Sequence, residues 1–446
     1  MKSKLIALAV IIFVLAGFST SAQIDDDIAP VQLSTSSVVC VTRGECQPDM
    51  AVDDSIIFVV WPEQDGDNQN TLYFASSTDE GQTFVAPTAI PVTTSPSTRD
   101  PSVAIASDGT ILLTWTDDRA GNDEVLISSS TDNGSTWRWD TNGDFFNLSN
   151  NSGDSYDANV SVSDFGPVSV VWSDNTIDDV INPDGGRNVF MRFTFNPGQT
   201  DQTLLDLISL TNTINVSKRF IASLGSPATS PQVKFSPNAN LDNPEVILIW
   251  QQAVTSDEEI FFHQTQSFNP TIVSNPDISI ESRNPTIAVT SPPAPGGGGP
   301  RDITQAVIAW EEPSGSRSRI LFSGSTDVSF AFAPPRFSDN ILELSDADEF
   351  ASNPNINASL DGNLYIAWQS DDLNSSDPTA IRLRFLSNVF SPIVTISERD
   401  GEVSGDATNP IVGTDLNNVY VSWVEENNST GQLDIFFAGR SRLSIF

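Results

Sequence analysis

The tryptophans recur along the chain with a regularity that few folds can accommodate. Seven of the nine end short apolar runs of one type, such as residues 111–115 (ILLTW) and 306–310 (AVIAW). They are Trp61, Trp115, Trp172, Trp250, Trp310, Trp368 and Trp423. Apart from one longer interval before Trp250, the period stays near about 57 residues, and a period sustained in this way predicts a repeat fold.

Each repeat unit reads as four strands. Strand A opens with proline, as in residues 101–105 (PSVAI), where the missing N–H costs no ladder hydrogen bond. A hairpin turn such as Asp108-Gly109 leads into strand B, which ends in the tryptophan. A short apolar strand C (125–128) and a strand D (341–345 in a later unit) complete the pattern. Because no segment keeps a 3.6-residue apolar period, we expect almost no helix.

Sheets of this kind bury both apolar faces only by packing against one another around an axis. We therefore predict an all-β fold, a seven-bladed β-propeller of four-stranded antiparallel blades. The seventh unit has no strand D of its own before the sequence ends, and residues 30–34 (PVQLS) match the missing strand. We expect this N-terminal strand to close the ring.

The N-terminus is typical of an export signal. Lys2 and Lys4 precede an apolar run over 5–18, and small residues follow at 20–22. We expect a signal peptide at 1–22 and a single propeller domain at 23–446, secreted to the extracellular space or cell surface without membrane insertion. Cys40 and Cys46 are the only cysteines, and in an exported chain they are expected to form a disulfide.

Charge and histidine content exclude several functions. The net charge of −37 opposes binding to nucleic acid or to an anionic membrane. A single histidine excludes a His-rich zinc site and argues against a His-dependent catalytic triad. The acidity favours either a solvated surface or the binding of a cation, for which Ca²⁺ is the candidate.

Two segments carry a resemblance to a known family. Residues 77–84 (STDEGQTF) and 130–137 (STDNGSTW) both fit S-x-D-x-G-x-T-(F/W), and 325–332 (STDVSFAF) keeps a decayed copy. The pattern resembles the Asp-box, or bacterial neuraminidase repeat, of the sialidase-like propeller superfamily. The resemblance implies that the boxes lie opposite the active site, so that Asp79 and Asp132 are scaffold residues.

The resemblance also directs attention to the other end of the blades. Sialidases of that superfamily have six blades, an arginine triad, a tyrosine nucleophile with its glutamate, and an aspartate acid/base. Here Arg99 and Arg283 stand two residues before the strand A proline, and Tyr156 has a comparable place. With seven blades expected and no Phe-Arg-Ile-Pro-like segment in the first, the set is incomplete and we assign no catalytic residue. The alternative is that the arginines pair with nearby acids such as Asp100.

An acid stands two residues after the tryptophan in five units. These are Glu63, Asp117, Asp174, Glu312 and Glu425. One interpretation is that they line the mouth of the channel with Arg99, Arg283 and Tyr156 and bind a ligand or a cation. The other is that they cap turns on a solvated surface, because recurrence at one repeat position has the same appearance.

These observations favour a non-catalytic binding propeller for an extracellular glycan or protein. The alternatives are an exo-acting glycoside hydrolase of the sialidase type and a structural component of the cell envelope. Loops from every blade converge on one concavity in a propeller, which suits all three, and fold alone does not choose among them.

Overall fold

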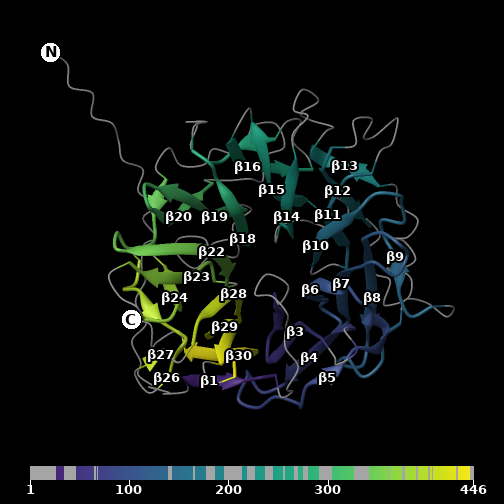
Figure 1. Ribbon diagram of the computed structural model, residues 1–446, viewed down its shortest axis with the longest axis horizontal. Helices are drawn as coiled ribbons and strands as arrows, with labels where there is room; N and C mark the ends of the chain where they lie inside the picture. The colour runs from purple at the N-terminus through teal and green to yellow at the C-terminus, as the bar shows by residue number, and fades with distance from the viewer. Residues whose placement is uncertain are drawn as a thin grey trace, which may run out of the picture.

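The structure is a computed structural model in which seven four-stranded antiparallel sheets surround a central axis (Figure 1). It describes residues 27–34, 47–64, 67, 69–138, 143–163, 166–176, 186–194, 213–217, 227–236, 245–254, 257–265, 270–274, 280–290, 304–325, 341–359, 361–373, 377–387, 390–399, 402–403, 405–427 and 430–441. The predicted fold class, a seven-bladed all-β propeller, is confirmed.

The first four blades follow one another along the chain. Blade 1 is β2 (Asp49–Asp53), β3 (Ile56–Gln64), β4 (Asn70–Ser77) and β5 (Thr88–Ala89), followed by the 3-10 turn η1 (Pro91–Thr93). Blade 2 is β6 (Arg99–Ile105), β7 (Ile111–Asp117), β8 (Glu124–Ser130) and β9 (Phe146–Asn147). Blade 3 is β10 (Ser155–Val162), β11 (Val168–Asp174), β12 (Asn188–Phe193) and β13 (Ile214–Asn215). Blade 4 is β14 (Ala228–Phe235), β15 (Val246–Val254), β16 (Asp257–Gln264) and β17 (Thr271–Ile272).

The remaining blades complete the ring. Blade 5 is β18 (Arg283–Thr290), β19 (Gln305–Ser314), β20 (Arg317–Gly324) and β21 (Leu342–Glu343). Blade 6 is β22 (Glu349–Ala358), β23 (Leu364–Asp372), β24 (Ala380–Leu386) and β25 (Val394–Thr395), followed by the hairpin β26 (Glu398–Arg399) and β27 (Glu402–Val403). Blade 7 is β28 (Ala407–Thr414), β29 (Asn418–Asn427) and β30 (Gln432–Ser441), with β1 (Ile28–Gln32) as its fourth strand.

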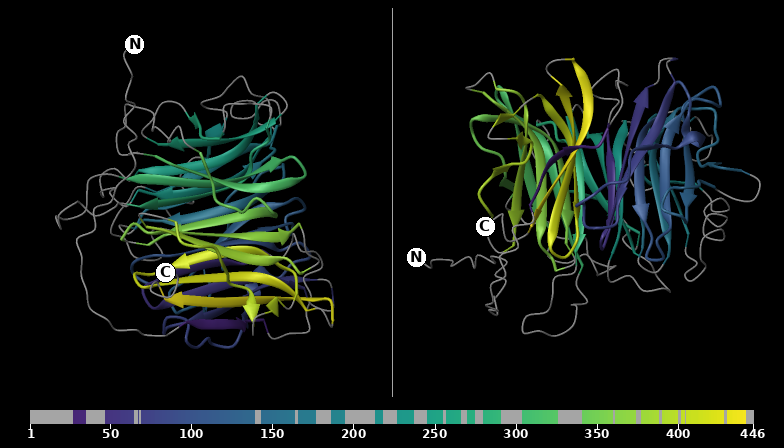
Figure 2. Two further views of the ribbon diagram at one scale, coloured as in Figure 1. Left: turned by 90° about the vertical axis from the view of Figure 1, so that its left-hand side faces the viewer. Right: turned by 90° about the horizontal axis from the view of Figure 1, so that it is seen from below.

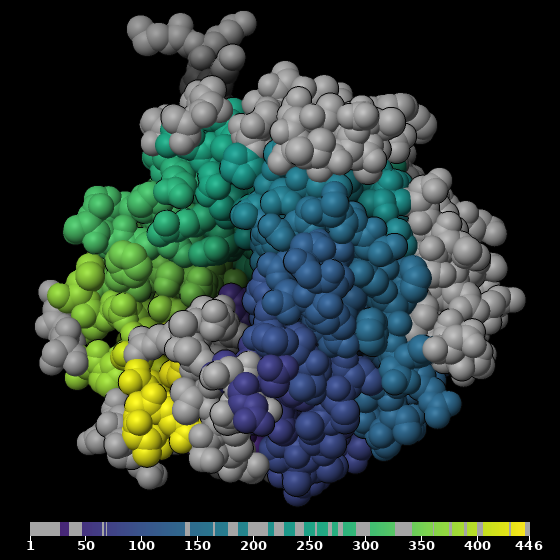
Figure 3. Space-filling model, turned by 45° about the vertical axis from the view of Figure 1, so that its right-hand side comes forward, coloured from purple at the N-terminus to yellow at the C-terminus, as the bar shows by residue number. Residues whose placement is uncertain are grey.

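Ring closure by the N-terminal strand is confirmed. β1 pairs antiparallel with β30, where Val31 lies opposite Phe437 and Gln32 opposite Phe436. The purple N-terminal strand and the yellow C-terminal strands consequently occupy the same side of the molecule (Figures 1 and 3). The strand begins at Ile28 rather than at Pro30, two residues earlier than the sequence suggested.

The apolar strands B are continuous because both of their faces are buried between blades. In β3, Ile57, Val59 and Trp61 pack toward blade 7, whereas Phe58 and Val60 pack toward blade 2. Successive side chains of a strand point to opposite faces, so one strand serves two interblade cores. The side views show the sheets stacked face to face in this way (Figure 2).

Each strand D is held by a hydroxyl as well as by its ladder. In every blade a Ser or Thr after strand D accepts a hydrogen bond from a backbone N–H of strand C, at 2.8–3.0 Å. The acceptors are Ser34, Thr93, Ser149, Ser217, Ser274, Ser345 and Ser397. Ser34 follows β1, so the N-terminal strand carries the same closing contact as the six other strands D.

The two full S-x-D-x-G-x-T turns adopt one geometry. In blade 1, Asp79 accepts hydrogen bonds from the Ser77 hydroxyl at 2.7 Å, the Thr83 amide at 2.9 Å and the Thr83 hydroxyl at 2.6 Å. Gly81 has φ +81°, and a Cβ there would lie 3.0 Å from the Phe437 ring. The Phe84 ring meets Phe437 edge-on at 4.8 Å, so the turn fastens blade 1 to blade 7.

The second turn repeats this arrangement one blade further on. Asp132 accepts from the Thr136 amide at 2.8 Å and from the Thr136 hydroxyl at 2.7 Å. Trp137 packs against Phe58 and Phe74 of blade 1. Gly134 has φ +85°, and a Cβ there would come within 2.5 Å of Phe74. Both turns lie at the end of the blades where strand A turns into strand B, as the Glu80 amide bonding to the Ser55 carbonyl indicates.

Some expectations fall outside the described residues. These are the signal peptide at 1–22, the disulfide between Cys40 and Cys46, and most of the decayed turn copy at 325–332. None of the helical segments among the described residues is both long enough and apolar enough to cross a bilayer.

A candidate ligand cavity on the propeller axis

Strand A enters six of the seven blades through a bulge with an unusual backbone. The residue before proline, or before Ala158 in blade 3, has a positive φ of 49–56°. These residues are Asp100, Asp157, Ser230, Asn284, Asn353 and Asn409. The pairing register shifts at the same point, for example between Arg99 and Ser102 in β6. A non-glycine residue in this region costs about 1–3 kcal/mol, and such strain gathers where ligands bind.

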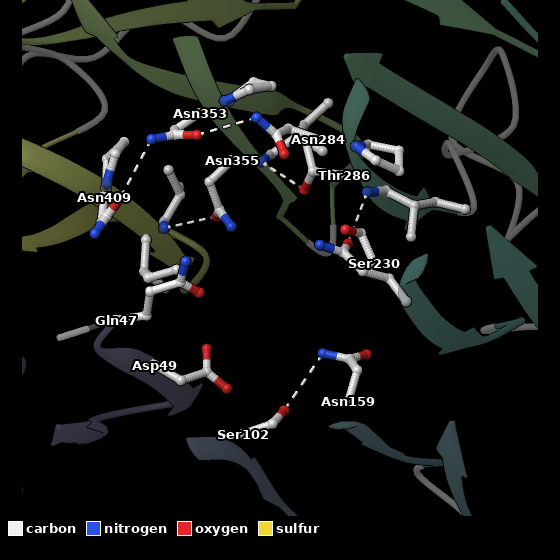
Figure 4. Close-up of a pocket in the computed structure, with 18 of the residues that line it drawn as sticks. Gln47, Asp49, Ser102, Asn159, Ser230, Asn284, Thr286, Asn353, Asn355 and Asn409 are labelled. Atoms are coloured by element: carbon white, nitrogen blue, oxygen red, sulfur yellow. Dashed lines mark hydrogen bonds between the residues drawn. The ribbon is translucent and has the colours of Figure 1, made fainter. Parts of the chain in front are cut away.

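The bulges surround a cavity of about 300 Å³ to which every strand A contributes. Its size is at the lower end of the range for small-molecule sites. In the close-up, the side chains of Asn284, Asn353 and Asn409 lie on one side, and Asp49 and Asn159 lie on the other (Figure 4). The open space between them is the candidate site.

The asparagine side is a row of amides. Asn284 Nδ2 donates to Asn353 Oδ1 at 3.2 Å, and Asn353 Nδ2 donates to Asn409 Oδ1 at 3.2 Å. The row is fixed from outside by Glu311, whose Oε2 accepts from Asn284 Nδ2 at 3.0 Å, and by Gln369, whose Oε1 accepts from Asn353 Nδ2. Because both N–H groups of Asn284 Nδ2 and of Asn353 Nδ2 are engaged in this way, these amides can interact with a hydroxyl-rich ligand through their Oδ1 atoms, which accept hydrogen bonds.

A second row of polar residues, one position after the proline, ties neighbouring blades together. Asp49 Oδ2 accepts from the Val103 amide of the next blade at 2.8 Å. The equivalent hydrogen bond, from a backbone amide of one blade to a side-chain oxygen of the blade before it, recurs in five more places. The acceptor and donor residues are Ser102 and Val160, Asn159 and Val233, Gln232 and Ile287, Thr286 and Ile356, and Asn355 and Val412. In blade 7 the position is Ile411, which has no acceptor, so the series is interrupted between blades 7 and 1.

The charged side chains that line the cavity are half-buried. Burial raises the pKa of Asp49, against hydrogen bonds from the Val103 and Met50 amides and the charge of Lys234. Burial likewise raises the pKa of Asp157, and a backbone hydrogen bond from Ser230 and the charge of Arg99 oppose it. Lys234 has its pKa lowered by burial, with Asp49 acting in the other direction. Partial burial is thus the main cause that shifts the pKa of each of these three groups.

Arg99 and Arg283 stand at the position expected from the sequence, but both guanidinium groups are paired. Arg99 forms a two-pronged pair with Asp123, at 2.6 and 3.2 Å, and lies 3.4 Å from Asp100. Arg283 donates twice to Glu311, at 2.8 and 3.0 Å. Neither arginine is among the residues that line the cavity. This is the pairing that the sequence offered as the alternative to a substrate clamp.

Tyr156 occupies the matching position in β10. Its hydroxyl is buried and, among the described residues, has no hydrogen-bond partner. The Arg187 guanidinium lies over its ring at 4.4 Å. The structure thus gives Tyr156 a cation–π neighbour. It shows no glutamate bonded to the hydroxyl among the described residues.

The five acids after the tryptophans are buried, and each accepts a hydrogen bond from the indole N–H of its own blade. The acceptors are Glu63 at 2.7 Å, Asp117 at 3.3 Å, Asp174 at 3.1 Å, Glu312 at 3.0 Å and Glu425 at 3.0 Å. Gln252 takes this place in blade 4, and Glu349 reaches across from strand A in blade 6. None of the five lines the cavity. Ligand binding by Glu63, Asp117, Asp174, Glu312, Glu425, Arg99, Arg283 and Tyr156 stays a prediction.

The sequence analysis did not single out the residues that do line the cavity. Their signal is the dipeptide before strand A, such as Asp100-Pro101, Asn284-Pro285 or Asn353-Pro354. We interpreted the proline as the first strand residue, whereas β6 begins at Arg99 and bulges around Asp100. Within the part of the chain that the structure describes, no group of three or more His, Cys, Asp or Glu residues could hold a metal ion.

Comparisons with known proteins give structural neighbours but no family. No protein-family model matches the chain, and no curated protein matches its sequence. An α-L-arabinanase of Penicillium chrysogenum solved with arabinobiose aligns with a TM-score of 0.49 and 11% identity over 94% of this chain and 99% of that chain. A protein of unknown function from Dyadobacter fermentans gives 0.47 and 13% over 93% and 99%.

Sialidases are also among the neighbours. A NanB sialidase variant from Streptococcus pneumoniae aligns with a TM-score of 0.46 and 10% identity over 87% of this chain and 84% of that chain. At such low identities and TM-scores, these likenesses carry no argument about the activity of this chain.

Proposed function

We propose that this chain is an exported, non-catalytic binding propeller that holds the end of an extracellular glycan in its central cavity. The observation that carries the proposal is the row of amides from Asn284, Asn353 and Asn409, fixed at the wall of a cavity of about 300 Å³. Sugar hydroxyls donate hydrogen bonds, which the side-chain carbonyl oxygens of this row can accept. The volume suits one or two sugar rings.

The same proposal includes that the protein does not catalyse glycoside hydrolysis. A sialidase-type mechanism would need free arginines, and Arg99 and Arg283 are engaged by Asp123 and Glu311. It would also need a tyrosine activated by a glutamate, and the Tyr156 hydroxyl has no hydrogen-bond partner among the described residues. We further propose that the turns at 77–84 and 130–137 are Asp-boxes, which supports membership of the sialidase-like superfamily.

The test is a glycan array followed by calorimetric titration of the glycans that bind. Asn353 has φ +49°, so Asn353→Gly removes the amide without strain in the backbone. We expect this variant to lose affinity by about tenfold, the value of one hydrogen bond of roughly 1.4 kcal/mol. The matched control is Asn133→Gly, which has φ +54° in the turn at the opposite end and should bind as the parent does.

Three results would overturn the proposal. An array without any bound glycan would remove the ligand class and leave a protein partner or an envelope role. Equal affinity in Asn353→Gly and the parent would move the site elsewhere. Turnover of fluorogenic glycosides, including sialosides, would show that the protein is an enzyme. Loss of that turnover in Arg99→Ala and Arg283→Ala would show that these arginines bind the substrate.

A further inference from the structure

Lys234 is a charged residue at a strand A position that is uncharged in the other six blades. It lies on β14, lines the axial cavity, and is the only lysine among the described residues of a chain with a net charge of −37. Its partner across the ladder is Ile247, three residues before Trp250. The residue in this register position is therefore identifiable in every blade.

The equivalent residues show that packing does not require a lysine here. They are Ala51, Ala104, Ser161, Ala288, Asn357 and Gly413. Four of them are alanine or glycine, because the strands A converge on the axis. A Cβ on Gly413, for example, would come within 2.5 Å of Val52. Ala51 and Ala288 pack in interblade cores, whereas Lys234 lines the axial cavity.

The Lys234 side chain is half-buried, and its ammonium has no protein partner among the described residues. No hydrogen bond or ion pair joins its Nζ to a described residue, although an ammonium has three N–H donors. The charge that acts on it is that of Asp49, on the other side of the ring. The Asp49 oxygens are already engaged by the Val103 and Met50 amides. An ammonium that faces a polar cavity and has no protein partner can donate charge-assisted hydrogen bonds to an anionic group of a ligand.

We propose that Lys234 anchors a carboxylate of the bound ligand, so that the glycan recognised in this cavity ends in a uronic acid. The proposal rests on the proposed function and names its ligand class. The carboxylate would accept from Nζ on the axis while the ring hydroxyls face Asn284 and Asn353 on the wall. The five acids that follow the tryptophans are buried outside the cavity, so the acids near a bound carboxylate would be Asp49, Asp100 and Asp157.

The experiment compares D-glucuronate with D-glucose, which differ only at C6. We expect the parent protein to bind glucuronate at least about tenfold more tightly, as a charge-assisted hydrogen bond provides. Lys234→Met, similar in length but uncharged, should bind the two sugars equally. The control Arg317→Met removes one positive charge on blade 5 outside the cavity and should keep the preference.

A second measurement does not depend on the folding of a variant. Acylation of Lys234 in the parent protein by a soluble active ester, followed by mass spectrometry, should be slowed by glucuronate and unaffected by glucose. Equal affinity for the two sugars in the parent, or a preference that persists in Lys234→Met, would refute the anchor. If neither acidic nor neutral glycans bind at all, the proposed function itself fails.

Discussion

At the scale of single residues, the seven blade tryptophans share a requirement for an acceptor rather than for a charge. Glu63 and Glu425 satisfy the indole N–H with a carboxylate two residues on, but Gln252 does so with an amide. In blade 6 the position is Ser370, and Glu349 supplies the oxygen from strand A. Residues i and i+2 of a strand share a face, so this contact was available to sequence reasoning and was missed.

This requirement predicts different outcomes for two substitutions of Glu425. Glu425→Gln should leave the free energy of unfolding within about 0.5 kcal/mol of the parent, because Gln252 does the same work in blade 4. Glu425→Leu should lower it by about 1–3 kcal/mol, since the Trp423 N–H is then buried without an acceptor. Urea denaturation measures both, and equal values for the two variants would contradict the assignment.

If Lys234 anchors the carboxylate, uronate binding should depend on pH. Burial lowers the pKa of Lys234 below its ordinary 10.5, against the charge of Asp49 on β2. Asp100 on β6 and Asp157 on β10 are the other acids that line the cavity. Affinity for glucuronate should therefore fall as pH rises through this lowered pKa, while affinity for glucose should not follow it. Calorimetric titrations from neutral to alkaline pH check this, and parallel curves for the two sugars would count against the anchor.

At the scale of elements, strands B and C were predictable and strand A was not. An apolar run that ends in tryptophan forms a strand buried on both faces, and its limits follow from its composition. Strand A was expected to begin at its proline, as at Pro101, but the bulge at Asp100 carries the strand back to Arg99. Positive φ before proline runs against local preference, and the ring imposes it, so single-strand reasoning did not find it. Strand D, expected over 341–345, has only Leu342–Glu343 in the ladder.

The two Asp turns should contribute to acid stability. Hydrogen bonds from the Thr83 hydroxyl and amide hold the pKa of Asp79 below its ordinary 3.8. For Asp132, burial acts to raise the pKa, and the Thr136 amide and hydroxyl outweigh it. A native pKa below the unfolded one means stability that is present above pH 3.8 and is lost as pH falls through the lowered value.

The double variant Asp79→Asn, Asp132→Asn tests this linkage. Between about pH 5 and pH 2, the parent should lose more free energy of unfolding than the double variant, because the variant has no carboxylate to protonate at these turns. Glu80→Gln, a neighbouring charge on the same turn, should retain the acid sensitivity of the parent. Identical pH profiles for the parent and the double variant would show that the turns have no such role.

At the scale of the whole molecule, the sequence predicted the ring, the number of blades and the strand that closes it. It did not predict the cavity, because the cavity exists only where seven strands A meet. The residues that line the cavity with Lys234, such as Asp49 and Asn409, lie far away in the sequence. The cavity is formed by all seven blades together, so the sequence pattern of a single repeat does not predict it.

The closing strand gives a matched pair of substitutions. Leu33 is 4% exposed and packs between blades 7 and 1, whereas Val31 is 39% exposed. Leu33→Ser should lower the free energy of unfolding by about 2–4 kcal/mol, and Val31→Ser by less than about 1 kcal/mol. Thermal and urea denaturation measure the difference. Two equal and small effects would mean that β1 does not hold the ring together.

The pairing of β1 with β30 also sets the order in which the protein can mature. β1 has as its partner β30, so that the Ser441 amide meets Asp27 across 414 positions. Six blades can assemble from neighbouring segments while translation continues, but the seventh cannot form until β30 has been synthesised. Until then the newborn chain has an uncovered strand edge at which it can pair wrongly with another copy. The ring therefore closes in one late step, after all the segments between β1 and β30 have been made.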